Sequence, residues 1–175
     1  DVNELLDKII KKHRKLADQT IRNSTIKKQL VEKLSTDVSE LQELVRGLTL
    51  LKEVSVRSLD YLISFGERFS DDLVSYAIQD LKKKSTALNG KEVGIVTDSN
   101  FGESRPLMDT TRIRISKTLG SLLSKKVIPV VGGFAGADQH GNITTFGRGG
   151  SDYTATIIAS CINADEVWLM SDVDG

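Results

Sequence analysis

The sequence predicts an α/β protein in which a mainly helical N-terminal half precedes a mostly parallel sheet covered by helices on both faces. Apolar residues recur at helical spacing through the first half of the 175 residues. From Asn89-Gly90 onward, short apolar runs alternate with helical stretches. Because apolar strands separated by helices are typical of parallel sheets with both faces buried, this alternation sets the predicted class.

Three helical stretches are expected before the Asn89-Gly90 turn. Leucine, isoleucine, valine and alanine recur at helical spacing over residues 5–17, and again over residues 30–48. A third stretch of this kind runs over residues 56–84. The charged residues between the apolar positions, such as KKHRK, form the solvent-facing side of these helices.

Short apolar runs in the second half are the predicted strands. They are VGIV (93–96), VIPVV (127–131) and VWLM (167–170), and a hairpin is expected at residues 143–146. Helices are predicted over residues 111–123 and from Ser151 onward. The strands at 127–131 and 167–170 are expected to be buried, because they are continuously apolar.

Polar or glycine-rich loops follow the carboxyl ends of these strands. Thr97 and Asp98 follow the first, GGFAG (132–136) follows the second, and SDVDG (171–175) follows the third. Ligands of parallel sheets bind at this edge. We therefore expect one site there, built from loops that are far apart in the sequence.

Charge and composition favour a small ligand over a nucleic acid or a membrane. Lys+Arg and Asp+Glu both number 24, whereas nucleic-acid-binding domains normally carry a basic excess. No apolar run approaches the ~20 residues of a membrane span. The single cysteine, Cys161, excludes an intramolecular disulfide and fits a reducing, cytoplasmic compartment; we expect it to be a small buried residue.

The sequence predicts no protein-bound metal site. Its two histidines and one cysteine show no paired ligand spacing, and the DVDG run lacks the ligand ladder of a calcium loop. Neither a GxSxG motif nor a Walker A motif occurs. A bound nucleotide would therefore be held by other loops.

The stretch FGRGGSDYTATIIAS (146–160) has the composition of an anion-binding loop. Its glycines allow backbone N–H groups to approach a ligand, and Arg148 suits a carboxylate or phosphate. Ser151 and Asp152 are favoured helix N-caps. A tight turn before a helix explains the glycines equally well, and a plain N-cap explains Asp152.

Glu67 is the most informative residue of the helical half. It lies four positions after Ile63 and eight after Leu59, so the three share one helix face. A carboxylate on a core-facing stripe is costly unless it is paired. We consider two roles, binding the ammonium group of a substrate or lysine, or reaching water at the edge of the stripe.

Four segments together resemble the aspartokinase family of the amino-acid-kinase superfamily. They are SFGERFS (64–70), VIPVVGGFAG (127–136), TTFGRGGSDYTA (144–155) and MSDVDG (170–175). Their order and spacing match, and the resemblance covers essentially the whole chain. The family usually has Leu where Phe146 stands and Thr where Ser171 stands, and both changes are conservative.

The resemblance implies a three-layer α/β/α sandwich, the amino-acid-kinase fold. It implies transfer of the γ-phosphoryl group of ATP, with Mg²⁺, to the side-chain carboxylate of L-aspartate. The product is 4-phospho-L-aspartate, at the head of lysine, threonine and methionine biosynthesis. The resemblance also implies a homo-oligomer.

The same resemblance assigns roles to residues at matching positions. Those expected at the substrate are Glu67, at its amino group, Arg148, at a carboxylate, and the nearby Ser151. Asp152 is expected to organise the region of the catalytic lysine and the metal. Ser171 and Asp172 are expected to contact the nucleotide, and the loop of Gly132 and Gly133 is expected to pass close to the site.

The family's opening Lys-Phe-Gly-Gly-Thr segment does not occur in the sequence. We therefore expect residues 1–175 to be a partial catalytic domain, without the first strand and its lysine and without C-terminal ACT regulatory domains. Such a fragment is expected to be inactive alone. Two alternatives remain, an amino-acid kinase acting on another carboxylate, and a non-catalytic binding or dimerisation module in which residues 1–51 serve an interface.

Overall fold

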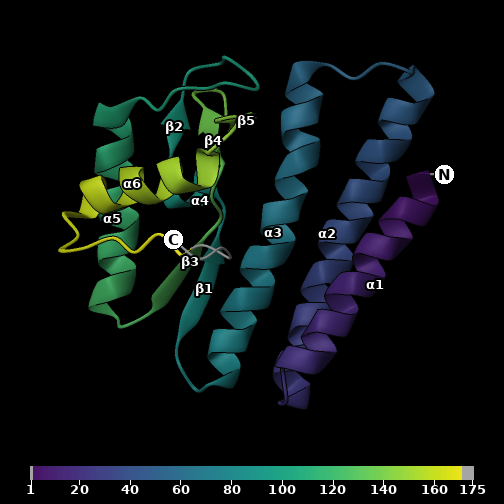
Figure 1. The fold of residues 1–175 in the computed structure, drawn as a ribbon, viewed down its shortest axis with the longest axis horizontal. Helices are drawn as coiled ribbons and strands as arrows, with labels where there is room; N and C mark the ends of the chain where they lie inside the picture. Colours follow the sequence, from purple (N-terminus) through teal and green to yellow (C-terminus); the bar gives the residue numbers. More distant parts are fainter. Residues whose placement is uncertain (1, 171–175) are drawn as a thin grey trace.

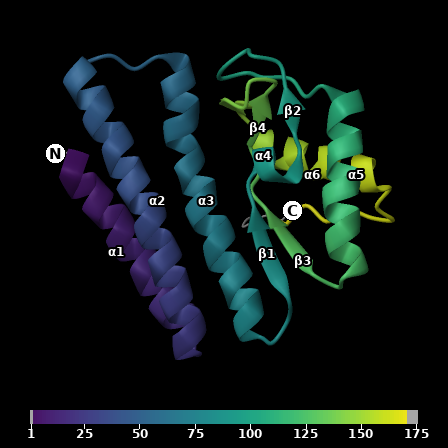
Figure 2. The same ribbon diagram turned by 180° about the vertical axis from the view of Figure 1, so that it is seen from behind.

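The structure is a computed structural model that describes residues 2–170, and it arranges them in three layers (Figures 1 and 2). The first layer contains α1 (Val2–Thr20), α2 (Ser24–Leu51) and α3 (Val56–Asp80), with α3 against the strands. The strands form the middle layer. On their other side lie α5 (Met108–Ser124) and α6 (Gly150–Ile162). The predicted α/β class with a helical first half is confirmed.

The strands form two small sheets in which parallel pairing dominates. β1 (Ser85–Leu88) pairs in parallel with β3 (Ile128–Val131). β2 (Val96–Thr97) pairs in parallel with β4 (Ala135–Asp138), and β4 forms the predicted antiparallel hairpin with β5 (Ile143–Thr145). Because β1 and β3 run in the same direction, both end at the edge that faces α3 and the short helix α4 (Gly90–Val93).

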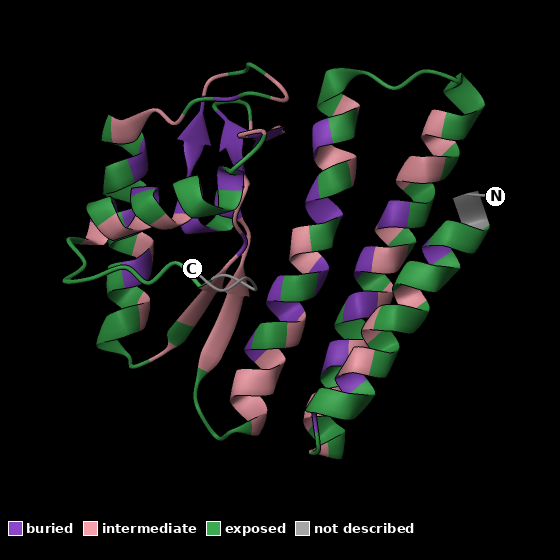
Figure 3. Cartoon of the chain, viewed as in Figure 1, coloured by how far each residue is buried: buried purple, intermediate pink, exposed green. Residues whose placement is uncertain are grey.

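The helical layer has its own apolar core. Leu30, Leu34 and Leu41 of α2 are buried together with Phe65 and Phe69 of α3 (Figure 3). Burial of each such side chain contributes about 1.5–3 kcal/mol. No described helix is long and apolar enough to span a membrane.

A second core lies between the strands and the outer helices. It contains Ile95 before β2, Ile115 and Leu119 of α5, and Ile157 of α6. Cys161 belongs to this core and is 3% exposed, as predicted for a small buried residue.

The boundaries around the first strands differ from the prediction. The third helix ends at Asp80 rather than near residue 84, and the next residues form β1. The VGIV run is largely not a strand, since α4 ends at Val93 and only Val96 of the run is in β2. The cause is a capping box, in which Asn89 and Glu92 exchange hydrogen bonds and begin a helical turn just before the apolar run.

The prediction of buried strands at 127–131 and 167–170 was wrong in two ways. β3 is only half-buried, with Ile128 43% exposed. VWLM is not a strand, and its Trp168 is 76% exposed. A strand requires a neighbour that accepts its backbone hydrogen bonds, and no described strand pairs with this run.

Candidate functional site

A groove of about 910 Å³ separates α3 from the carboxyl ends of β1 and β3. Tyr61, Ser64 and Glu67 form its α3 wall, together with Asp71. Its opposite wall includes Asn89, just after β1, and Gly132 and Gly133, just after β3. The groove therefore lies at the sheet edge where the sequence predicts a site.

Glu67 lies in this groove but not on the face that the sequence predicts. Leu59 and Ile63, which share its helix face, are 43% and 41% exposed, so this face is not turned to the core. Glu67 is half-buried by the sheet-side loops, and burial raises the pKa of its carboxyl group. Within residues 2–170 the carboxylate has no hydrogen-bond or ion-pair partner, which leaves it free for a ligand.

The glycine-rich loop 146–150 meets Glu67 across a second, shallower depression of about 290 Å³. Gly147, Gly149, Ser151 and Asp152 line this depression together with Glu67. The fold thus brings together two of the segments singled out from the sequence, which are about 80 positions apart. These residues surround a volume suited to a small polar molecule.

The Gly132-Gly133 loop passes directly beneath the start of α6. A Cβ on Gly133 would lie 2.9 Å from the Cα of Ser151, so only glycine fits there. The following Phe134 has a φ of 71° and donates its N–H to the Thr154 hydroxyl of α6, at 3.0 Å. A bulky residue in this conformation is strained, and the contact with α6 holds it in place.

Helix α6 begins differently from the prediction. Its N-cap is Gly149, whose φ of 76° suits glycine, and the helix starts at Gly150. Ser151 and Asp152 are therefore not N-caps but residues of the first turn. There the exposed Asp152 carboxylate is favoured by the positive end of the helix dipole.

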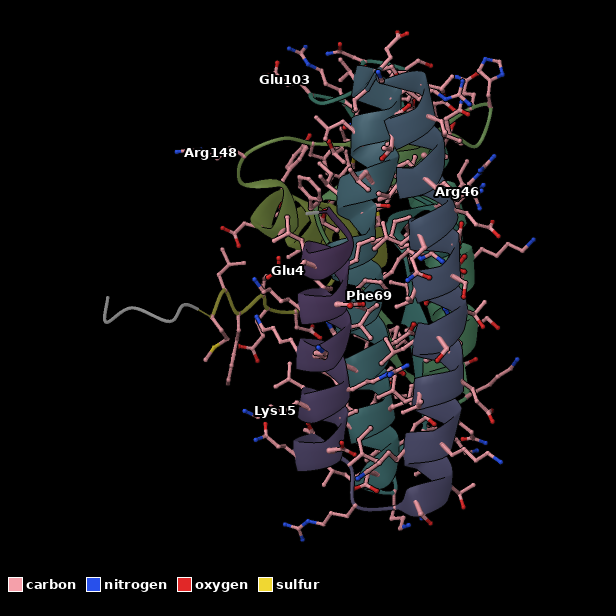
Figure 4. The ribbon with its side chains drawn as sticks, turned by 90° about the vertical axis from the view of Figure 1, so that its right-hand side faces the viewer. Glu4, Lys15, Arg46, Phe69, Glu103 and Arg148 are labelled. Carbon is pink, nitrogen blue, oxygen red and sulfur yellow. The ribbon has the colours of Figure 1, made fainter. Side chains whose placement is uncertain are left out.

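Arg148 points away from the body of the protein (Figure 4). Its side chain is exposed and has no ion-pair partner in the part of the chain that the structure describes. The guanidinium is thus available to an anion, and the residues on either side of Arg148, Gly147 and Gly149, line the depression that Glu67 also lines.

Of the other polar residues predicted at this edge, Asp98 does not contribute to the described site. Asp98, after β2, accepts the N–H groups of Asn100 and Arg105 and stabilises its own loop. Ser171 and Asp172 lie outside the described residues.

Asp60 is a buried polar residue that the sequence analysis missed. It is 1% exposed, and its carboxylate accepts the N–H of Thr145 at 3.0 Å, the Thr145 hydroxyl at 2.7 Å and the N–H of Gly102 at 2.9 Å. Thr145 immediately precedes the glycine-rich loop. Asp60 therefore fixes α3, which carries Glu67, against β5, which leads into that loop.

Asp71 is the second acidic residue that the sequence analysis missed. It is 7% exposed, lines the groove one helical turn after Glu67, and its Oδ2 has no hydrogen-bond partner among the described residues. A signal was present in the sequence, since Asp60, Ser64, Glu67 and Asp71 follow helical spacing. This polar stripe marks the face of α3 that meets the sheet.

The described residues contain no group of three or more His, Cys, Asp or Glu side chains placed to hold a metal ion.

The chain belongs to the amino acid kinase family, whose sequence profile matches residues 4–175. The resemblance identified from the four sequence segments is thereby confirmed at the level of this family.

Within the family, aspartokinases are among the similar proteins. The chain is 37% identical over 136 residues to the chloroplastic aspartokinase 3 of Arabidopsis thaliana, covering 77% of this chain and 24% of that protein. It is 33% identical over 167 residues to the aspartate kinase of Pseudomonas putida, covering 95% of this chain and 37% of that protein. The chain thus spans well under half the length of these relatives.

The fold is also similar to solved aspartokinases. Escherichia coli aspartokinase III, in complex with lysine and aspartate, superposes with a TM-score of 0.83 at 25% identity, over 92% of this chain and 34% of that one. The same enzyme in complex with aspartate and ADP gives a TM-score of 0.81.

Proposed function

We propose that the protein carrying this chain is an aspartate kinase, which transfers the γ-phosphoryl group of ATP to the side-chain carboxylate of L-aspartate. The product is 4-phospho-L-aspartate, and its formation is the first step of lysine, threonine and methionine biosynthesis. The observation that carries the proposal is the meeting of Glu67 with the loop of Arg148, Ser151 and Asp152 around one depression. The similarity to aspartokinases supports it.

Glu67 in the depression and Arg148 on the adjoining loop carry opposite charges, which suit an amino acid with two carboxylates. We assign Glu67 to the α-ammonium group, because its half-buried carboxylate has no partner within the described chain. We assign the exposed Arg148 to a substrate carboxylate, which a guanidinium holds with two hydrogen bonds. Ser151 lines the same depression as Glu67.

The reaction requires no general base. A substrate carboxylate with a pKa of about 3.9 is already ionised at neutral pH, and one of its oxygens attacks the γ-phosphorus. The new O–P bond forms while the bond to the β-phosphate oxygen breaks, and ADP leaves. The protein has to bring two anions together, which is a task of positioning and charge neutralisation.

ATP is the phosphoryl donor in this proposal, and Mg²⁺ enters with its phosphates. Mg²⁺ typically keeps several waters and takes one or two protein carboxylates, so the single carboxylate of Asp152 fits such an ion. Gly132 and Gly133 provide the close backbone approach, and Ser171 and Asp172 are proposed nucleotide contacts. We further propose a cytoplasmic homo-oligomer.

The activity is proposed for the whole protein, and the 175-residue chain by itself is expected to be inactive. It spans 24% of the Arabidopsis relative and 37% of the Pseudomonas putida relative. Transition-state charge would be poorly neutralised by the described residues alone, among which Arg148 is the cation of the loop.

The test is ATP-dependent formation of an acyl phosphate, trapped with hydroxylamine, with L-aspartate or L-glutamate as acceptor. We expect turnover with L-aspartate. Arg148→Gln should lower kcat/KM for L-aspartate by about 100-fold or more, because one charge-assisted contact is worth roughly 1.5–3 kcal/mol or more in a closed site. Arg46→Gln, at an exposed arginine of α2 (Figure 4), is the matched control and should leave it unchanged.

Turnover with L-glutamate alone would instead indicate a kinase acting on another carboxylate. Absence of turnover with both acceptors in the whole protein would favour a non-catalytic member of the family.

A further inference from the structure

Asp71 is buried without the partner that a buried carboxyl group normally has. It is 7% exposed, and its Oδ2 accepts no hydrogen bond from any described residue. The carboxyl group packs over Gly132, where a Cβ would lie 2.3 Å from Oδ2. Buried polar groups are nearly always paired, so an unpaired one beside a groove indicates a missing ligand.

No cation of the described chain neutralises Asp71. The charged groups nearest to it on α3 and α4 are the acids Glu67, Asp72 and Glu92. Arg68 and Lys33 line a pocket together with Asp71, and both are engaged elsewhere. Arg68 pairs with Asp37 and Glu40, and Lys33 pairs with Asp37 and Asp72. Two further cations line the groove: Arg57 at the start of α3, and Lys91 of α4, which donates to the Gly141 carbonyl oxygen at 3.0 Å.

The residues of β1 and of the loop after β3 that lie against Asp71 are uncharged. The last residues of β1, Ala87 and Leu88, lie beside it in a shallow pocket, and Gly132 follows β3. Helix α3 thus presents two carboxyl groups to the groove, one turn apart, and the pKa of neither is lowered by a neighbouring cation. Side chains at this spacing have Cβ atoms roughly 5–6 Å apart, which is the span that one small cation bridges.

We propose that Asp71 and Glu67 together bind the α-ammonium group of the amino-acid substrate, and that Asp71 releases its carboxyl proton when the ammonium group binds. This inference rests on the proposed function, and it adds a second substrate-binding residue together with a coupling between binding and pH.

Two carboxyl groups so close cannot both be ionised at low cost in an empty groove. Burial, and then the charges of Glu67, Asp72 and Glu92, raise the pKa of Asp71 to about 8. The empty groove therefore holds Asp71 as the neutral acid at pH 7. An arriving ammonium group offers N–H donors and a positive charge, which favour the carboxylate. The proton passes to the solvent, and no covalent bond to the substrate forms.

The proton that leaves is measurable. Isothermal titration of the whole protein with L-aspartate, in buffers of different ionisation enthalpy, gives the number of protons released. With a pKa of about 8 for Asp71, we expect about 0.9 proton per aspartate at pH 7 and about 0.1 at pH 9.

Asp71→Asn keeps the size of the side chain and removes the titrating group. We expect it to abolish proton release, and to reduce at least tenfold the preference for L-aspartate over succinate, which lacks the ammonium group. Asp109→Asn, at an exposed aspartate in the first turn of α5, is the matched control and should retain both properties. The melting temperature of each variant verifies that it is folded.

The outcomes separate the inference from the function on which it rests. If the protein binds and phosphorylates L-aspartate but releases no proton at pH 7, or if Asp71→Asn keeps the preference over succinate, the inference is wrong and the function stands. If L-aspartate neither binds nor is phosphorylated, both are wrong.

Discussion

Helix α3 meets the sheet in two regions, and each buries one aspartate in a different state. Asp60, at the contact with β5, accepts three hydrogen bonds and is enclosed. Asp71, three turns later at the groove, has an oxygen that accepts none. The same residue type on the same side of one helix thus serves two purposes. The satisfied carboxylate fixes the architecture, and the unsatisfied one remains available to a ligand.

The difference follows from what each region of the sheet offers. Near Asp60, the backbone of Thr145 and Gly102 presents N–H groups that must be satisfied. Near Asp71, Gly132 presents a Cα without a side chain, and its own N–H is already bonded to the Leu88 carbonyl oxygen. A buried acid without donors costs stability, which is the pattern of a site built for function.

Removing Asp60 should have the largest effect on stability. Asp60→Ala leaves two backbone N–H groups and one hydroxyl without their acceptor, and should lower the free energy of unfolding by about 3–5 kcal/mol. Asp60→Asn should cost less than ~1 kcal/mol, because its amide oxygen accepts both N–H groups and the Thr145 hydroxyl turns to accept from the amide. Urea denaturation measures both. A loss below 1 kcal/mol for the alanine variant would show that Asp60 does not hold α3 to the sheet.

The second-largest effect is expected in the pH dependence of the free energy of unfolding. The pKa of Asp71 is raised from 3.8 to about 8 in the folded state, so between these values the folded protein holds a proton that the unfolded chain has lost. The free energy of unfolding therefore falls as the pH rises through this window, by up to ~1.4 kcal/mol per pH unit.

Asp71→Asn should remove this slope. The variant is expected to match the wild type below about pH 4, and its advantage in the free energy of unfolding should grow by about 2–4 kcal/mol between pH 5 and pH 8, in urea denaturation series. Parallel curves for the two proteins from pH 5 to 8 would mean that Asp71 ionises normally. Since burial also raises the pKa of Asp72, the difference between the two proteins is the informative quantity.

A smaller effect is expected where Asp71 meets the sheet. Gly132→Ala places a methyl group on Oδ2 and should destabilise by about 1–2 kcal/mol, because the buried side chain has little room to turn away. In an Asp71→Ala background the same substitution should cost almost nothing. This double-mutant cycle gives the coupling directly. If Gly132→Ala destabilises the protein equally in both backgrounds, the Asp71 carboxyl group does not pack against Gly132.

The glycine-rich loop should show the smallest effect on stability. Arg148 is exposed and has no ion pair with a described residue, so Arg148→Gln should change the free energy of unfolding by less than ~0.5 kcal/mol. Combined with the expected loss of activity, this would assign Arg148 to the ligand rather than to the fold. A change above 1 kcal/mol in thermal or urea denaturation would argue for a structural role instead.

The sequence predicts the helical half well and the strands less well. Apolar positions recur over several turns of α1 to α3, so the prediction of these helices does not depend on any single residue. β1 was missed because its sequence, STAL, is short and half-buried, and it combines two polar with two apolar residues. VWLM was misassigned because a strand depends on a partner that local composition does not reveal.

The sheet edge at which the groove lies was predictable, but the arrangement of the residues in the groove was not. Glycine residues after the apolar run at 127–131 correctly indicated the sheet edge at Gly132, whereas the close approach of Gly133 to Ser151 is shown only by the fold. The N-cap is Gly149, which has a left-handed backbone conformation. The sequence instead favoured Ser151 and Asp152, because serine and aspartate are common N-cap residues. Asp60 and Asp71 follow helical spacing, but only the fold reveals that one has three donors and the other none for its Oδ2.

The ionisation of Asp71 is the most direct test of this contrast. Protein labelled with ¹³C at the aspartate carboxyl carbons allows each carboxyl group to be titrated by NMR, and the Asp71→Asn variant assigns the signal. The account predicts that the Asp71 signal titrates near pH 8 in the free protein and shifts to lower pH when L-aspartate is bound. A signal that titrates near pH 4 in the free protein would contradict it.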